Sequence, residues 1–221
     1  MHALVTGANR GLGLEVARQL ADRGYVVWAG ARDPEAVPPL GGAVRPVRLD
    51  VTEPAQVEAA RAQIDRLDVL VNNAGILGDD GLVLAANFAP VHRLMETNTF
   101  GPWRVAAAFA DLLRASGHGR IVNVSSSVAS LERMVDMGPA YLTSKLALNG
   151  ITRMLAVALR EDGVLVNAIC PGWMDTDMGR VAGPGGRPVE EAAKAVMWAA
   201  TLPDDGPTGG FFEGEGEPLP W

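Results

Sequence analysis

Tyr141 and Lys145 are the two residues of this 221-residue chain whose types and spacing most clearly suggest chemistry. The chain has only two tyrosines, and only two of its nineteen basic residues are lysine. Residues four positions apart share one face of a helix, so the phenol and the ammonium can point into one cleft. A phenol has a pKa of about 10, and a nearby ammonium favours its ionised form. The pair therefore predicts proton transfer, with Tyr141 as a general acid or general base.

Three glycines near the amino terminus, in TGANRGLG (6–13), form a second stretch with a chemical use. A short apolar run precedes them, and apolar residues at helical spacing follow, which predicts a strand, a tight turn and a helix. Such a turn directs backbone N–H groups and the positive end of the helix at a phosphate. The stretch therefore predicts a dinucleotide-binding turn, with a tight turn that binds nothing as the alternative.

Strands and helices alternate along the rest of the chain. We expect strands at 3–5, 25–29, 44–49, 67–75, 120–125, 164–170 and 209–212. Near-continuous apolar strands separated by helices are typical of a parallel sheet covered on both faces. We expect a single Rossmann-type, doubly wound α/β domain over residues 1–221, with a parallel sheet of about seven strands. Pro46 indicates that its strand lies near a sheet edge. Thr52 is the expected cap of a helix that starts near Pro54. The three prolines in 32–42 predict that the helix usually found there is short or absent.

Composition limits the class of protein. No apolar run approaches the ~18 residues needed to cross a bilayer, the start does not have the pattern of a secretory signal, and the single cysteine, Cys170, can form no internal disulfide. We therefore expect a soluble, cytoplasmic protein. The net charge of −7 offers no basic field for nucleic acid or an acidic membrane, so small molecules are the expected partners. The three histidines show no ligand spacing, and no metal site is expected.

Six motifs occur in a fixed order along the chain. They are TGANRGLG (6–13), NNAG (72–75), NTFG (98–101), VSSS (124–127), YLTSK (141–145) and PGWMDT (171–176). Together they resemble the short-chain dehydrogenase/reductase family. Three stretches resemble its carbonyl-reductase-like branch: TGANRGLG (6–13), CPGWMDTDM (170–178) and LPDDGPTGGFFEGEGEPLPW (202–221). A long insertion found in some members of that branch is absent, since only fourteen residues separate Ser126 from Tyr141. Asp175 and Asp177 are interpreted as ordinary polar loop residues.

The resemblance implies a catalytic group made of Tyr141, Lys145, Asn98 and a serine. Lys145 would hold the nicotinamide ribose and connect the phenol to a proton relay through Asn98, for which a plain helix asparagine is the alternative. Ser126 would donate a hydrogen bond to the substrate oxygen. Ser127 remains a second candidate for that hydroxyl, whereas the serine before Ser126 is assigned to strand-end hydrogen bonding.

The resemblance also implies a nicotinamide cofactor. The residues assigned to it are Gly7, Asn9, Arg10, Gly11, Leu12, Gly13, Arg32, Asp50, Val51, Asn73, Ala74, Gly75, Tyr141, Lys145, Pro171, Gly172, Met174 and Thr176. Ala31 stands where an acidic residue would accept from the ribose 2′-OH of NAD, and two guanidiniums, Arg10 and Arg32, suit a 2′-phosphate. NADP(H) is therefore preferred over NAD(H). A shift of two residues would instead place Asp33 near the ribose and favour NAD.

The function implied is that of an NADPH-dependent oxidoreductase that transfers a hydride to a small aldehyde, ketone or quinone. One alternative is an NADP-dependent alcohol dehydrogenase, since the same groups serve both directions. Another is a cofactor-binding sensor or signalling protein on the same fold. The substrate cleft is expected in the C-terminal part, about 126–190, and to be open and weakly selective. Family members pair the helices that carry Asn98 and Tyr141, but the branch includes monomers, so monomer and homo-oligomer are both open.

Overall fold

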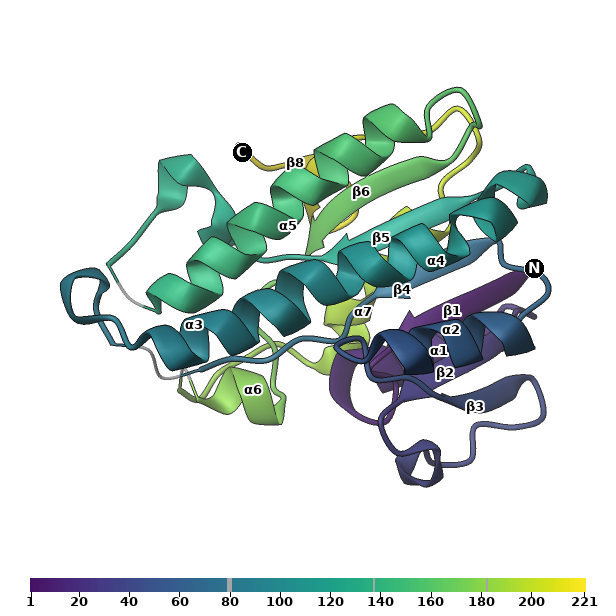
Figure 1. The fold of residues 1–221 in the computed structure, drawn as a ribbon, viewed down its shortest axis with the longest axis horizontal. Helices are drawn as coiled ribbons and strands as arrows, with labels where there is room; N and C mark the ends of the chain where they lie inside the picture. The colour runs from purple at the N-terminus through teal and green to yellow at the C-terminus, as the bar shows by residue number, and fades with distance from the viewer. Residues whose placement is uncertain (79–80, 137, 182) are drawn as a thin grey trace.

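Eight strands form one sheet in the computed structural model, which describes residues 1–78, 81–136, 138–181 and 183–221 (Figure 1). The order is β3-β2-β1-β4-β5-β6-β7-β8. The strands are β1 (His2–Thr6), β2 (Val26–Ala31), β3 (Val44–Arg48), β4 (Val69–Asn72), β5 (Arg120–Val124), β6 (Leu165–Cys170), β7 (Phe211–Glu213) and β8 (Glu217–Pro218). The first seven pair in parallel, and the two-residue β8, which the sequence did not predict, is antiparallel to β7. The predicted α/β plan is confirmed, and so is the edge position of the strand that contains Pro46.

Helices cover both faces of this sheet (Figure 1). They are α1 (Gly11–Asp22), α2 (Pro54–Gln63), α3 (Phe88–Met95), α4 (Gly101–Ser116), α5 (Pro139–Ala158), α6 (Asp177–Arg180) and α7 (Val189–Ala200). Neighbouring residues of β1 contribute to apolar cores on opposite faces of the sheet. Val5 packs with apolar residues of α1 and α7, and Leu4 packs with those of α2 and α4. Both faces of β1 are therefore apolar, as expected of a covered parallel sheet. No helix among the described residues is long and apolar enough to cross a membrane.

Short turns connect several of these elements. They are the 3₁₀ turns η1 (Pro34–Ala36), η2 (Val83–Ala85), η4 (Ser127–Ala129) and η5 (Leu131–Arg133), and the π-helical turn η3 (Glu96–Phe100). The three residues of η1 confirm that the helix expected after β2 is short. The predicted cap of α2 is wrong, because Glu53 occupies that position and no side chain caps the helix. Thr52 instead donates its backbone N–H and its hydroxyl to the Asp50 carboxylate, closing a local turn before the helix.

The carboxyl ends of the parallel strands meet at one edge of the sheet. The glycine turn follows β1, NNAG ends and follows β4, the serines follow β5, and Pro171 follows β6. In an open parallel sheet the crevice outside these ends is the usual ligand site. The fold therefore gathers motifs that lie far apart in the sequence.

Candidate active site

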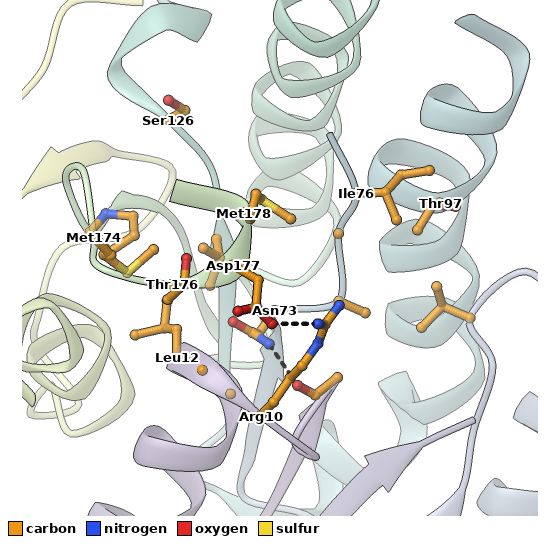
Figure 2. A pocket seen from close by; sticks show the side chains of 18 of the residues that line it. Arg10, Leu12, Asn73, Ile76, Thr97, Ser126, Met174, Thr176, Asp177 and Met178 are labelled. Carbon is orange, nitrogen blue, oxygen red and sulfur yellow. Dashed lines mark hydrogen bonds and ion pairs between the residues drawn. The ribbon is translucent and has the colours of Figure 1, made fainter. Parts of the chain in front are cut away.

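A cavity of about 910 Å³ opens at the carboxyl edge of the sheet. Every residue assigned above to the cofactor lines it, and so does Ser126. Figure 2 shows part of this lining, with side chains from the glycine turn, the loop after β4, the end of β5 and the segment around α6. Asn98 is the one predicted site residue that is not among the described lining residues.

The glycine turn leaves an open cradle of backbone beside this cavity. Gly7 and Gly11 have φ values of +67° and +54°, a region that side-chain-bearing residues rarely adopt. A Cβ on Gly13 would overlap the Gly7 carbonyl oxygen and the Asn73 amide nitrogen. That amide holds the turn in place, since Nδ2 donates to the carbonyls of Thr6 at 2.9 Å and Gly7 at 3.2 Å. A backbone cradle at the start of a helix fits the pyrophosphate of a dinucleotide.

Tyr141 and Lys145 lie one turn apart on α5, and both line the cavity. The Lys145 Nζ donates to the Val124 carbonyl at 2.8 Å and lies 5.8 Å from the centre of the Tyr141 ring. Burial raises the pKa of Tyr141 to about 12, helped by the nearby Cys170 and opposed by a hydrogen bond with Ser126. The lowered pKa expected for this phenol is therefore not found, because burial acts in the opposite direction. Tyr141 keeps its proton at neutral pH.

Three consecutive serines after β5 have different surroundings. The Ser125 hydroxyl is buried and donates to the Asn149 Oδ1 at 2.7 Å. Ser127 begins η4, and its backbone N–H donates to the Cys170 sulfur at 3.1 Å. Ser126 lines the cavity and hydrogen-bonds Tyr141. Its place beside the phenol supports Ser126 over Ser127 as the hydroxyl that would contact a substrate.

Asn98 lies in the π-helical turn η3, which joins α3 to α4, and is fully buried. Its Nδ2 donates to the Ile76 carbonyl at 2.9 Å and to the Ser144 Oγ at 3.0 Å, and its Oδ1 accepts from the Ile76 N–H at 2.8 Å. A Cβ on Gly75 would lie 3.4 Å from this Oδ1 and 3.5 Å from the Lys145 Nζ. Asn98 therefore ties the loop after β4 to α5, close to Lys145.

At the other end of the cavity, Ala31 is the last residue of β2, and Ala31 and Arg32 both line the cavity. Asp33 is not among the described lining residues, and its carboxylate caps the η1 turn. Arg10 does not point freely into the cavity, because its Nη1 pairs with the Asp177 Oδ2 at 2.8 Å (Figure 2). Asp177 is thus more than an ordinary polar loop residue.

A family model for short chain dehydrogenases matches residues 1–185. The chain belongs to the short-chain dehydrogenase family. It is 32% identical to (+)-neomenthol dehydrogenase of Arabidopsis thaliana over an alignment 285 positions long, gaps included, which covers 96% of this chain and 95% of that one. Among similar solved structures, the NADPH-bound carbonyl reductase from chicken fatty liver has a TM-score of 0.86 and 29% identity, covering 100% of this chain and 98% of that one. The carbonyl reductase Sniffer of D. melanogaster has a TM-score of 0.91 and 28% identity, with coverage of 100% and 99%.

This short-chain dehydrogenase is accordingly an oxidoreductase, and its resemblance to the carbonyl-reductase-like branch is confirmed. Ile76, Cys170 and Asp177 are among the lining residues that the sequence did not assign to the site. Ile76 and Cys170 directly adjoin the NNAG and PGWMDT motifs, so their positions could have indicated them. Asp177 also adjoins PGWMDT, but its pairing with Arg10 had no local signal, because the two residues lie 167 positions apart.

Proposed function

We propose that this dehydrogenase is an NADPH-dependent reductase that transfers a hydride to the carbonyl of a small aldehyde, ketone or quinone. The observation that carries the proposal is that Tyr141, Lys145 and Ser126 line the same cavity as the glycine cradle. Binding of a dinucleotide in the cradle would bring its reactive end and these polar groups into one cleft. The similarity to an NADPH-bound carbonyl reductase supports both the cofactor and the substrate class.

In the proposed mechanism Tyr141 is the general acid. The reduced nicotinamide supplies the hydride when the cofactor is bound. The Tyr141 hydroxyl donates its proton to the carbonyl oxygen as negative charge develops there, while Ser126 donates a hydrogen bond to the same oxygen. The raised pKa of Tyr141 keeps that proton available until the substrate arrives. The carbonyl gains one hydride and one proton, and the phenolate, which the Lys145 ammonium stabilises, regains a proton from water.

Two guanidiniums support a 2′-phosphorylated cofactor. Arg10 and Arg32 would bind the phosphate, because planar guanidiniums donate pairs of hydrogen bonds to phosphate oxygens. Ala31 at the end of β2 leaves the position without a carboxylate, and Asp33 is engaged in capping η1. We therefore infer a preference for NADP(H) over NAD(H).

The substrate would bind between Ser126 and the segment around α6, within the C-terminal part at about 126–190. Met174 and Met178 line this end of the cavity (Figure 2). Methionine side chains are apolar and adaptable, so they accept substrates of different shapes. This lining supports an open cleft that accepts several apolar carbonyl compounds.

Two copies of the protein would associate through the outer face of α4 and α5. This face carries the exposed apolar side chains Trp103, Met154 and Val157, with Phe100 at the junction of η3 and α4. Apolar side chains exposed on one uncovered helix face favour association. The proposed interface would support the helices that carry Asn98 and Tyr141.

The test is the loss of NADPH absorbance with a panel of aldehydes, ketones and quinones. We expect turnover with several panel members and a decrease in kcat of about 10²- to 10⁴-fold in Tyr141→Phe, the usual contribution of general acid catalysis. Tyr25→Phe is the control, since Tyr25 lies on the opposite edge of the sheet, before β2. Equal activity in the Tyr141→Phe variant and the parent protein would reject the assigned acid. Turnover confined to alcohols and NADP would favour the oxidative direction.

A further inference from the structure

Four charged side chains connect the glycine turn to the segment that contains α6. Arg10 Nη1 lies 2.8 Å from Asp177 Oδ2, as the dashed line in Figure 2 shows. The other oxygen of Asp177 lies 3.4 Å from Arg180 Nη1, and Arg180 Nε lies 2.7 Å from Asp175 Oδ1. All four residues line the cavity, and the side chains of Arg10 and Asp177 are about two thirds exposed. The pairs therefore bridge the open side of the cavity.

The local fold holds Asp177 beside the glycine turn. Thr176 caps α6 by accepting from the Gly179 N–H at 3.0 Å, which fixes the backbone immediately before Asp177. A Cβ on Gly11 would lie 3.5 Å from the Thr176 methyl group, so the two segments almost touch. The Trp173 indole donates to the Gly179 carbonyl at 2.9 Å and joins the start of the segment to α6. The contact between Arg10 and Asp177 thus follows from a packed backbone arrangement.

We propose that Asp177 reduces the preference of the cavity for dinucleotides with a 2′-phosphate over those without one. This inference rests on the proposed function, in which Arg10 binds that phosphate. Asp177 occupies the Arg10 Nη1, so a 2′-phosphate that binds through both Nη atoms of this guanidinium must displace the Asp177 carboxylate from Arg10. The 2′-hydroxyl of NAD(H) carries no charge and does not require this exchange. Asp177 therefore weakens NADP(H) binding and leaves NAD(H) binding unchanged.

Arg180 lowers the free-energy cost of displacing Asp177 from Arg10. After displacement, Asp177 still has the Arg180 guanidinium close to its second oxygen, so the carboxylate is not left without a partner. Among the ion pairs of the described residues none involves Arg32, so the competition concerns Arg10. Exposed ion pairs contribute little free energy, which corresponds to an effect of roughly two- to fivefold on the dissociation constant.

The first experiment compares NADPH and NADH dissociation constants by fluorescence titration of the parent protein and Asp177→Asn. We expect the Kd for NADPH to fall by roughly two- to fivefold and the Kd for NADH to stay the same. Asp175→Asn is the matched control, because it removes the same charge from the same segment but its partner is Arg180. An equal change for both cofactors, or no change for NADPH, would overturn the inference.

A second variant separates this inference from the proposed function. Arg10→Gln should weaken NADPH binding selectively, and adding Asp177→Asn to it should have no further effect. If Arg10→Gln weakens NADPH binding but Asp177→Asn changes nothing in the parent protein, the competition is wrong while the phosphate site stands. If Arg10→Gln alters neither affinity, both fail. Because the side chains of Arg10 and Asp177 are exposed, these substitutions should not disturb the fold, and misfolding would weaken the binding of both cofactors.

Discussion

Lys145 carries a positive charge in a position that is only 5% exposed, an arrangement that opposes ionisation. Its Nζ donates to one carbonyl oxygen, that of Val124. Burial lowers the pKa of Lys145 to about 8, and the nearby Cys170 only partly offsets this effect. Because the pKa of Tyr141 is about 12, the ammonium loses its proton well before the phenol does. The charge that stabilises the phenolate in the proposed mechanism is therefore the more sensitive of the two to alkaline pH.

We expect kcat/KM for carbonyl reduction to fall as the pH rises above about 8, because the Lys145 ammonium is then lost before the carbonyl substrate binds. Below that pH the ammonium is retained and this contribution to the rate is constant. The measurement is a pH profile of kcat/KM at saturating NADPH. Arginine stays protonated throughout, so Lys145→Arg should be slower and have no alkaline decrease. An alkaline decrease of the same size in Lys145→Arg would contradict the assignment to Lys145.

At the scale of elements, the turn between β1 and α1 depends on the close approach of three backbone segments. Gly13 lies in the first turn of α1 against the Gly7 carbonyl, and the Asn73 amide from the end of β4 fills the remaining space. Even one methyl group at residue 13 would have to push the turn away from β4. The shape of the cradle is thus set by packing between elements as much as by the flexibility of glycine.

Gly13→Ala should destabilise the protein by about 1–3 kcal/mol, the usual cost of overpacking, and should weaken NADPH and NADH binding together. Gly42→Ala is the matched control, because Gly42 has open space around its Cβ position and no positive φ. The measurements are urea unfolding and cofactor titration on both variants. An unchanged unfolding midpoint in Gly13→Ala would contradict the predicted clash between a Cβ at residue 13 and the Gly7 carbonyl.

The sequence predicted the elements whose signals are local. Apolar runs indicated seven strands, the prolines in 32–42 indicated the short η1, and Pro46 indicated an edge strand. The cap of α2 was misassigned because Thr52 finds a closer acceptor in Asp50. The π-helical turn around Asn98 has no composition signal, since it depends on hydrogen bonds to Ile76 and Ser144 across the fold. The raised pKa of Tyr141 could not be predicted from the sequence either, because the burial that raises it depends on the whole fold.

At the scale of the whole molecule, α4 and α5 lie side by side and turn one face away from the sheet (Figure 1). Val157 is 66% exposed and Met154 is 59% exposed on α5, and Trp103 on α4 is 43% exposed. A charged substitution there would not disturb the core, because these side chains already face outward. Association through this face would bury apolar area from both copies, which stabilises a dimer by about 25 cal/mol per Å² before the costs of binding.

We expect sedimentation equilibrium to give the mass of a dimer for the parent protein and of a monomer for Met154→Glu/Val157→Glu, because a dimer would bury the added carboxylates unpaired. Leu84→Glu is the control, since Leu84 is 99% exposed on η2 rather than on this face, and it should remain dimeric. Circular dichroism of each variant checks that the fold is retained. A monomeric parent protein would remove the interface and leave the catalytic proposal intact, because Tyr141, Lys145 and Ser126 all line one cavity of a single chain. A dimer that survives both glutamates would place the interface elsewhere on the molecule.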